Sequence, residues 1–353
     1  MIITRAPLRI SFIGGGTDLP DFYHASPGRV ISATINQYVY TVVNRTPLIK
    51  QVSARYSANE LVNHPGELKN DRIREALLDV GITSGVEVGT FSHLPGGTGL
   101  GSSSSFAVGL IKALHLVKGV KLSASEVAEA ASRLEIDLVG EPIGKQDQYA
   151  AAFGGFNIFQ FNQDDSVDVT PILLDYKKKF DLESHLLLFF TGITRSASSV
   201  LTEQKSNISD KFDTLVEMAS AVDQFYDLLM AGDFSGMGAM LHVHWLKKKS
   251  LAQAVSNPVI DDLYQAGIES GAWGGKVLGA GGGGCLLFLA DPACHDAIRR
   301  SVQAIAHHQQ LSNFNEIPVR FVQSGAEILV NTGQFMVGPT VRPQAEASHA
   351  RLH

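Results

Sequence analysis

The chain of 353 residues is poor in cysteine, in charge and in long apolar runs. Its two cysteines, Cys285 and Cys294, do not make a disulfide framework, which favours a reducing compartment such as the cytoplasm. No apolar run reaches the roughly 18 residues of a membrane span, and no signal-peptide pattern opens the chain. The net charge of −6 excludes the basic excess typical of nucleic-acid binding. We therefore expect a cytoplasmic protein that binds neither membranes nor nucleic acid.

Hydrophobic residues, by contrast, make up 44% of the chain, enough for a sizeable core, and the length favours two domains. Residues 29–43 and 86–92 predict strands, whereas the spacing over 106–117 and 212–229 predicts helices, the second of which ends near Gly232. Ser123 and Glu126 form the capping box of another expected helix, whose apolar spacing continues through Leu138. Strands and helices do not alternate regularly, which favours an α+β fold over a doubly wound sheet. We predict domains over 1–185 and 186–335, followed by a peripheral tail over 336–353.

The stretch LPGGTGLGSSSS, residues 94–105, joins glycines and serines directly to the helix predicted after it. Glycines permit positive φ and a close backbone approach, and a helix N-terminus offers free N–H groups to a phosphate. The stretch is not a Walker A loop, because no Gly-Lys-Ser/Thr follows, and the protein-kinase motifs are absent. A flexible linker is the alternative, but a linker does not run straight into a helix. We interpret the stretch as a phosphate-binding loop.

A second glycine run, KVLGAGGGGC, spans residues 276–285. It matches the sequence pattern G-x-G-x-x-G, but its glycines precede an expected strand instead of following one. This order excludes the dinucleotide-binding interpretation. Two interpretations stay open, namely a tight structural turn and a backbone wall beside a phosphate or substrate.

Four charged residues are candidates for the chemistry. Asp147, in an expected loop between two glutamines, is suited to orienting a hydroxyl nucleophile, and Glu135 to holding a metal, although spacing alone favours a solvated or capping role for each. Asp18 follows a glycine turn and is suited to accepting hydrogen bonds from a polyol, while also being an ordinary turn residue. Arg9 precedes it on an expected strand.

Together these stretches resemble the GHMP kinase superfamily. Residues 95–103 match its P-x-x-x-G-L-G-S-S motif, and residues 9–18 and 279–284 resemble its early and late motifs. Glu135 and Asp147 stand twelve positions apart, as the metal-binding and catalytic acids do in galactokinase-like members. The segments GGGTDLP, SATINQYVY, DQYAAAFGGFN and TGITRSA resemble heptose 7-phosphate kinases and fucokinase domains more closely. Lys145 departs from the small residue that is frequent in related kinases.

The resemblance implies a fold and a set of roles. The fold is an N-terminal domain like the second domain of ribosomal protein S5 and a ferredoxin-like C-terminal domain, with ATP between them. Asp147 and Arg9 would be catalytic, and Ser103 with Glu135 would hold Mg²⁺. The residues implied for ATP are Pro95, Gly96, Gly97, Gly99, Leu100, Gly101, Ser102, Ser103 and Ser104. Those implied for a sugar or sugar-phosphate substrate are Gly16, Thr17, Asp18, Lys145, Arg195, Gly281, Gly282 and Gly283.

The implied reaction is transfer of the ATP γ-phosphoryl group to the anomeric C1 hydroxyl of D-glycero-D-manno-heptose 7-phosphate. A second phosphate on the substrate needs a cationic pocket, for which Lys145, Arg195 and residues 247–249 are candidates, the last three also being compatible with a solvated helix end. Alternatives are another sugar-1-kinase, such as a fucokinase or a galactokinase-like enzyme, and a non-catalytic binding protein. A homodimer is one of the oligomeric states that the sequence allows.

Overall fold

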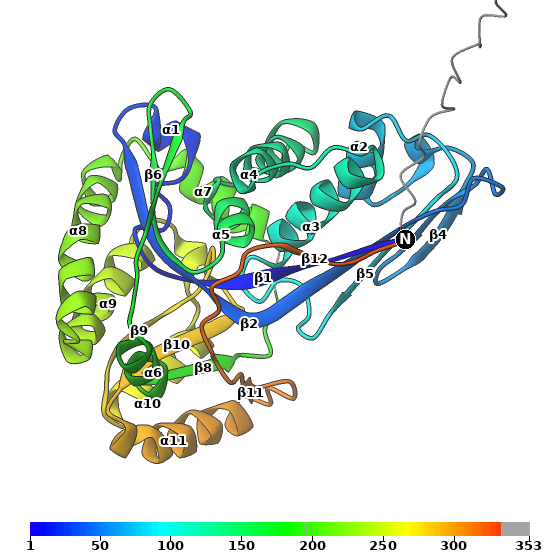
Figure 1. Cartoon of the computed structure of the whole chain (residues 1–353). Helices are drawn as coiled ribbons and strands as arrows, with labels where there is room; N and C mark the ends of the chain where they lie inside the picture. The colour runs from blue at the N-terminus through cyan, green and yellow to red at the C-terminus, as the bar shows by residue number, and fades with distance from the viewer. Residues whose placement is uncertain (195–196, 333–353) are drawn as a thin grey trace, which may run out of the picture.

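The computed structural model describes residues 1–194 and 197–332, which form two β-sheets covered by helices (Figure 1). The larger sheet runs in the order β12–β1–β2–β5–β3–β4, with β6 paired to β2 and β7 to β6. Its strands are β1 (Ile2–Ile13), β2 (Gly28–Arg45), β3 (Val52–Arg55), β4 (Asn59–Val62), β5 (Val86–Ser92), β6 (Phe156–Phe161), β7 (Val167–Pro171) and β12 (Glu327–Asn331). The smaller, antiparallel sheet runs β11 (Asn315–Glu316), β8 (Leu186–Phe190), β10 (Cys285–Ala290) and β9 (Ala272–Val277).

The helices divide between the two sheets. Helices α3 and α5 pack on β1 and β2 of the large sheet, and α10 packs on β9 of the small one. Helix α8 contacts β1 and β2 while α9 contacts β9, β10 and β1, so this pair joins the two halves (Figure 1). The helices are α1 (Pro20–Tyr23), α2 (Asp71–Asp79), α3 (Ser102–Val117), α4 (Ala124–Arg133), α5 (Gln146–Phe153), α6 (Tyr176–Ser184), α7 (Ala197–Ser206), α8 (Phe212–Ala231), α9 (Phe234–Lys249), α10 (Pro258–Glu269) and α11 (His295–His308).

Local sequence signals set several element ends. The Ser123 hydroxyl accepts the Glu126 N–H while the Glu126 carboxylate accepts the Ser123 N–H, so the predicted capping box is confirmed. Helix α8 ends at Gly232 in the left-handed conformation, with φ of 75°. The predicted strands are β2 and β5, and the helix predicted from residue 106 begins earlier, at Ser102.

The helix expected to continue through Leu138 changes its geometry at Leu134. Residues Leu134–Leu138 form a π-helical turn, in which the Val139 N–H donates to the Leu134 carbonyl at 3.0 Å. Such a turn holds one more residue than an α-helical turn and therefore rotates the side chains that follow. Asp147, which we expected in a loop, lies instead on the first turn of α5.

The end of the described chain returns to the sheet in which the chain began. Strand β12 pairs antiparallel with β1, with Ile2 opposite Asn331. The small sheet begins at Leu186, next to the boundary we predict, but β12 lies beyond that boundary and joins the large sheet. The division of the chain into domains stays a prediction.

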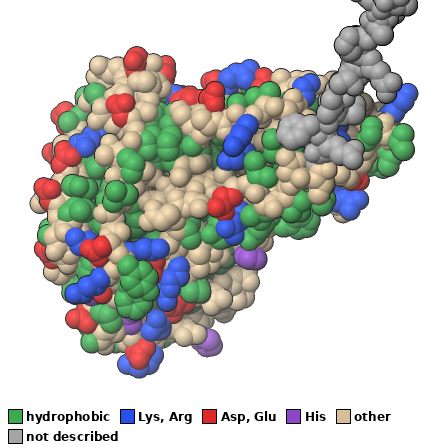
Figure 2. Space-filling view, viewed as in Figure 1, with side chains coloured by type: hydrophobic (Ala, Val, Ile, Leu, Met, Phe, Trp, Pro, Cys, Tyr) green, Lys and Arg blue, Asp and Glu red, His purple; other side chains and the backbone are tan. Residues whose placement is uncertain are grey.

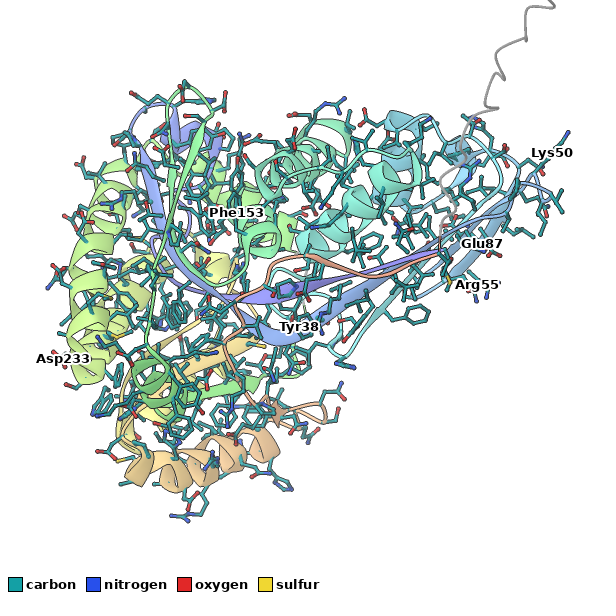
Figure 3. All side chains as sticks on the ribbon, viewed as in Figure 1. Tyr38, Lys50, Arg55, Glu87, Phe153 and Asp233 are labelled. Atoms are coloured by element: carbon teal, nitrogen blue, oxygen red, sulfur yellow. The ribbon has the colours of Figure 1, made fainter. Side chains whose placement is uncertain are left out.

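Aromatic side chains connect the elements of the core. The Phe12 ring on β1 lies 6.0 Å from the Phe156 ring on β6 and 5.8 Å from the Phe225 ring on α8. An arm formed by the ends of β2, β3 and β5 reaches away from this core, and Figure 3 shows Lys50, Arg55 and Glu87 on it. On the face seen in Figure 2, basic and acidic side chains are interspersed. Within the described ranges, no helix is long and apolar enough to cross a membrane.

His244 on α9 predicts a pH-dependent stability. Burial, together with the nearby Lys247 and Lys276 charges, lowers its pKa to about 4 in the folded protein. Below pH 6.5 the unfolded chain therefore binds a proton that the folded chain does not, and stability falls as the pH falls toward 4. Acidification from pH 7 to pH 5 should lower the free energy of unfolding of the wild type by about 2 kcal/mol more than that of the His244→Gln variant. Urea unfolding at both pH values measures this.

The matched control is His308→Gln, because His308 is exposed at the end of α11. This variant should keep the pH dependence of the wild type. An equal pH dependence in the His244→Gln variant and the wild type would contradict the assignment.

Candidate active site

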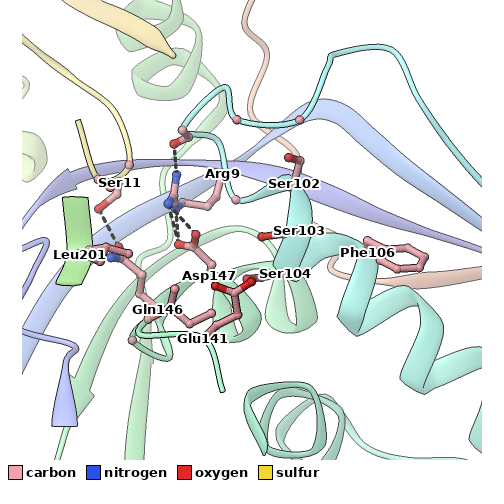
Figure 4. Close-up of a pocket in the computed structure, with 18 of the residues that line it drawn as sticks. Arg9, Ser11, Ser102, Ser103, Ser104, Phe106, Glu141, Gln146, Asp147 and Leu201 are labelled. Carbon is pink, nitrogen blue, oxygen red and sulfur yellow. Dashed lines mark hydrogen bonds and ion pairs between the residues drawn. The ribbon is translucent and has the colours of Figure 1, made fainter. Parts of the chain in front are cut away.

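A cavity of about 780 Å³ lies where the large sheet, the small sheet and the joining helices meet. Its wall combines the first glycine run, the end of β1 with the turn after it, the start of α5, and residues of α7, α9 and β9. Figure 4 shows part of this wall. The predicted site residues that line the cavity are Arg9, Gly16, Asp18, Gly96, Gly97, Gly99, Gly101, Ser102, Ser103, Ser104 and Asp147.

The first glycine run wraps one end of the cavity and leads into α3. Gly97, Gly99 and Gly101 have φ of 77°, 76° and 77°, a left-handed conformation that glycine adopts without strain. Gly101 caps α3, and Ser105 is the residue whose N–H donates back to the Gly101 carbonyl. The N–H groups of residues 102–104 therefore lie in the first turn of α3, where an anion is favourable. Pro95 and Leu100, also predicted here, do not line the cavity.

The second glycine run packs against the first. A Cβ atom on Gly99 would lie 2.3 Å from the Leu278 carbonyl oxygen, and one on Gly279 would lie 2.6 Å from the Gly99 Cα atom. The Cys285 N–H also donates to the Thr98 carbonyl at 2.8 Å. The run is thus a structural partner of the phosphate loop, and glycine is required because the two backbones touch.

Only the start of the second run reaches the cavity among the residues that the structure describes. Gly279 and Ala280 line it. Gly281 packs instead on the backbone of Val255, and Gly283 on the carbonyl of Ile193. Gly281, Gly282 and Gly283, predicted as substrate residues, do not line the cavity.

An ion pair occupies the middle of the wall. The Arg9 Nε donates to Asp147 Oδ1 at 2.7 Å and its Nη2 donates to Asp147 Oδ2 at 2.8 Å (Figure 4). The Arg9 Nη1 donates to the Gly99 carbonyl at 2.7 Å. One guanidinium therefore fixes the carboxylate in a bidentate geometry and ties it to the phosphate loop. The structure brings together the two residues predicted as catalytic.

A polar wall continues from this ion pair toward the turn after β1. The Ser11 hydroxyl donates to the Gln146 side-chain carbonyl at 2.8 Å, and the Gln146 N–H donates to Asp18 Oδ2 at 3.3 Å. Burial and the Asp147 charge raise the pKa of Asp18. Thr17 lies behind the wall, where its hydroxyl donates to the Gly14 carbonyl. Sequence reasoning did not identify Ser11, and only the fold of β1 against α5 reveals its position.

The two candidate carboxylates for a metal lie in different layers. The Glu135 side chain is 0% exposed, and it accepts hydrogen bonds from Arg72 Nε at 2.8 Å and Gln148 Nε2 at 2.7 Å. Glu141 lines the cavity instead, and Figure 4 shows it beside Ser104. Its carboxylate accepts hydrogen bonds from Arg72 at 3.1 Å and Ser198 at 2.5 Å. The sequence spacing that selected Glu135 did not indicate Glu141.

The basic residues predicted for a second substrate phosphate separate in the structure. Lys145 does not line the cavity, because its ammonium donates to the Asp165 carbonyl at 3.0 Å. Lys247 and Lys249 pair with Glu217 and Asp261, each at 2.7 Å. Lys248 alone of residues 247–249 lines the cavity. Arg195 lies outside the described residues.

The far end of the cavity is apolar and aromatic. It is lined by Tyr56, Phe91, Leu94 and Phe106, of which Phe91 is 61% exposed. Tyr56 follows β3, Phe91 and Leu94 belong to β5 and the start of the first glycine run, and Phe106 lies on α3, so no single sequence motif contains all four. A flat apolar ligand group adjoining the phosphate loop fits such a wall.

Comparison with known proteins agrees with this geometry. The GHMP kinases N terminal domain model matches residues 69–155, and the GHMP kinases C terminal model matches residues 225–308. The D-glycero-alpha-D-manno-heptose 7-phosphate kinase of Campylobacter jejuni is 32% identical over 313 residues, which cover 82% of this chain and 90% of that protein. The chain belongs to the GHMP kinases.

Two further proteins similar to this GHMP kinase have lower sequence identity. The L-fucokinase/L-fucose-1-P guanylyltransferase of Bacteroides fragilis is 28% identical over 84% of this chain, which matches 35% of that longer protein. The crystal structure of a D-glycero-D-manno-heptose 1-phosphate kinase from Bacteroides thetaiotaomicron shares the fold, with a TM-score of 0.76 at 24% identity over 94% of this chain and all of that one. The predicted two-domain GHMP fold and the kinase class are confirmed.

Proposed function

We propose that this GHMP kinase transfers the γ-phosphoryl group of ATP to the C1 hydroxyl of D-glycero-D-manno-heptose 7-phosphate. The observation that carries the proposal is the Arg9–Asp147 ion pair, held within one cavity beside a glycine loop that opens a helix. The substrate follows from the 32% identical heptose 7-phosphate kinase, which aligns over most of both chains.

Asp147 orients the sugar hydroxyl in this proposal. Phosphoryl transfer passes through a loose transition state, so positioning and charge neutralisation matter more than a strong base. Arg9 holds both oxygens of the Asp147 carboxylate, so the carboxylate keeps one orientation while it accepts the hydroxyl proton. Asp18, held by backbone N–H groups at the other end of the polar wall, accepts hydrogen bonds from further sugar hydroxyls.

The first glycine run binds the ATP phosphates. Its positive-φ glycines turn the backbone around the cavity, and the first turn of α3 offers N–H groups and the positive end of a helix dipole. The aromatic wall of Tyr56, Phe91 and Phe106 is suited to the adenine base. The nucleotide thus spans from the arm side of the cavity to the Arg9–Asp147 pair.

The oxygen groups on the cavity wall fit a magnesium ion. Mg²⁺ prefers oxygen ligands and binds through few protein groups, keeping several waters. Ser103 and Glu141 line the cavity, whereas Glu135 is 0% exposed and does not line it. We propose that Ser103 and Glu141 hold the ion and that Glu135 acts through Arg72, which contacts both carboxylates. The ion would neutralise the phosphate charge of ATP.

Removal of the Glu141 charge should therefore weaken magnesium binding. Glu141→Gln should raise the Mg²⁺ concentration needed for half-maximal ATP binding by roughly tenfold. Calorimetric titration of ATP at several Mg²⁺ concentrations measures this without turnover. Glu135→Gln should instead lower the melting temperature, since it disrupts a buried ion pair. If Glu135→Gln alone raised the Mg²⁺ concentration needed for half-maximal ATP binding, Glu135 and not Glu141 would be the metal ligand.

The substrate is tested by ADP release with Mg-ATP against heptose 7-phosphate, the unphosphorylated heptose, L-fucose, D-galactose and mevalonate. We expect turnover with the 7-phosphate. L-fucose is the second candidate, because a fucokinase is among the relatives. Turnover with an unphosphorylated sugar only would keep the phosphoryl transfer and overturn the heptose phosphate. ATP binding without turnover of any sugar would favour a non-catalytic protein.

A further inference from the structure

The three lysines that end α9 have different environments. Lys247 and Lys249 pair with Glu217 and Asp261 on the outside of the helix. Lys248 is 5% exposed and lines the cavity. A run that resembles a solvated helix end thus contains one buried ammonium group. Burial of a cation is unfavourable unless an anion or several acceptors compensate it.

A short chain of contacts connects Lys248 to the ion pair. The Lys248 ammonium donates to the Gly279 carbonyl. Gly279 packs directly on Gly99, and the Gly99 carbonyl accepts a hydrogen bond from Arg9 Nη1 at 2.7 Å. Lys248 is thereby held on the second glycine run at the point where that run touches the phosphate loop. This position adjoins the Arg9–Asp147 pair.

Lys248 carries a positive charge that no neighbouring carboxylate neutralises directly. Asp147 already balances Arg9 through two hydrogen bonds. No carboxylate of the described chain lies within 4.0 Å of the Lys248 ammonium, and Gly279 is its one hydrogen-bond acceptor there. Two of its three N–H groups are therefore available to a ligand in the cavity.

The surroundings of Lys248 place its titration near neutral pH. Burial and the Arg9 charge lower its pKa to about 8, while Asp18 and Asp147 oppose this. Arg9 comes from β1, Asp147 from α5, and Asp18 from the turn after β1. Lys276 of β9 is a further buried lysine of this wall, where burial lowers its pKa well below the usual value, and it donates to the carbonyls of Ser11 and Phe12 at 3.0 Å each. The negative charge of an incoming phosphoryl group would favour the protonated form of the Lys248 side chain over the neutral one.

We propose that Lys248 is a second cationic group of the transfer site, which donates hydrogen bonds to the oxygens of the phosphoryl group during transfer. This rests on the proposed function. The sugar C1 oxygen forms its bond to the γ-phosphorus as the bond from that phosphorus to the β–γ bridging oxygen breaks. The hydroxyl proton goes to Asp147, ADP leaves, and Lys248 keeps its own proton. Arg9 orients Asp147, and Lys248 compensates the charge that moves.

The alternative ligand for Lys248 is the 7-phosphate of the sugar. The contact with Gly279 beside Gly99 favours the transferred group, because the phosphate loop lies at that point. The two ligands differ in one measurable respect. A lysine on the transferred group affects every sugar substrate, whereas a lysine on the 7-phosphate affects only the phosphorylated one.

The test compares Lys248→Met, Lys248→Arg and the control Lys247→Met, whose wild-type lysine pairs with Glu217 outside the cavity. Lys248→Met should lower kcat by about 100-fold for heptose 7-phosphate and for the unphosphorylated heptose, with KM little changed. The wild-type kcat/KM should fall as the pH rises through about 8, when Lys248 loses its proton. In the Lys248→Arg variant this alkaline fall should disappear, since arginine stays charged. Lys247→Met should behave as the wild type.

A second readout needs no sugar turnover. Tetrafluoroaluminate with Mg-ADP mimics the phosphoryl group in transfer, and calorimetry compares its binding with that of Mg-ADP alone. The Lys248→Met variant should bind tetrafluoroaluminate with Mg-ADP about 100-fold more weakly than the wild type and bind Mg-ADP alone with unchanged affinity. If the wild type does not turn over heptose 7-phosphate, the proposed function fails while this binding comparison still decides the role of Lys248.

Four results would overturn the inference. One is a loss of activity for the 7-phosphate sugar only, which would assign Lys248 to the substrate phosphate. Another is an alkaline fall of kcat/KM that persists unchanged in the Lys248→Arg variant. The third is an equal loss of ADP and fluoroaluminate binding, and the fourth is a lowered melting temperature that Lys248→Arg does not restore. Either of the last two would indicate a structural role.

Discussion

Replacement of Asp147 by asparagine should lower kcat by about 10³-fold and leave both KM values within severalfold of the wild type. Asparagine keeps the shape of the side chain, but it carries no negative charge and cannot accept the sugar hydroxyl proton. It also presents an amide donor to the Arg9 guanidinium, which already donates to both carboxylate oxygens. Steady-state kinetics with Mg-ATP and heptose 7-phosphate measure the effect.

Asp223→Asn is the matched control for this experiment. Asp223 on α8 likewise accepts two hydrogen bonds from one arginine, Arg29, at 2.6 and 2.7 Å, but it is more exposed than Asp147. Asp223 does not line the cavity, and its variant should keep the wild-type kcat. A variant of Asp147 that keeps kcat but loses substrate binding would reject the proposed role in the chemical step.

Replacement of Gly99 by alanine should destabilise the fold by roughly 3 kcal/mol or more and abolish ATP binding. The new Cβ atom would lie 2.3 Å from the Leu278 carbonyl oxygen, and φ at this position is +76°. Backbone lies on both sides of this contact, so no side chain can move away to relieve it. Denaturant unfolding gives the stability, and calorimetry with Mg-ATP gives the binding.

Gly119→Ala separates the two causes of this effect. Gly119 has φ of +79° and no atom within 4 Å of an added Cβ, so alanine there brings the backbone strain without the clash. It should cost about 1 kcal/mol. Equal destabilisation by the Gly99 and Gly119 variants would show that the close approach of the two glycine runs contributes nothing.

Local chemistry is the part of this protein that the sequence predicts well. The Ser123 capping box, the glycine end of α8 and the strands β2 and β5 follow from neighbouring residues, and the structure confirms them. The return of β12 to β1 was not predictable in the same way, because 320 or more residues separate the paired positions. The π-helical turn at Leu134 depends likewise on packing rather than on the spacing of apolar residues.

In the candidate site, too, some residues could be predicted from local motifs and others only from packing. Arg9, Asp18, Asp147 and the glycines of the first run were identified from motifs, and all of them line the cavity, whereas Pro95 and Leu100 of that run do not. The sequence did not indicate whether Glu135 or Glu141 would line the cavity, nor which of the lysines at 247–249 would do so. Glu141 lies on the cavity wall after the π-helical turn, while Glu135, selected by its spacing from Asp147, lies behind it.

By itself the sequence determined the family and the kinase class, and it predicted a phosphate-binding loop, since these depend on short motifs of neighbouring residues. Only the tertiary structure decided that the second glycine run supports the first, that Glu141 faces the cavity, and that Lys248 is buried beside Arg9 and Asp147. The physical reason is that burial and unpaired charge are properties of a position among many segments. A run of three lysines gives the same local pattern whether its middle member faces water or a phosphoryl group.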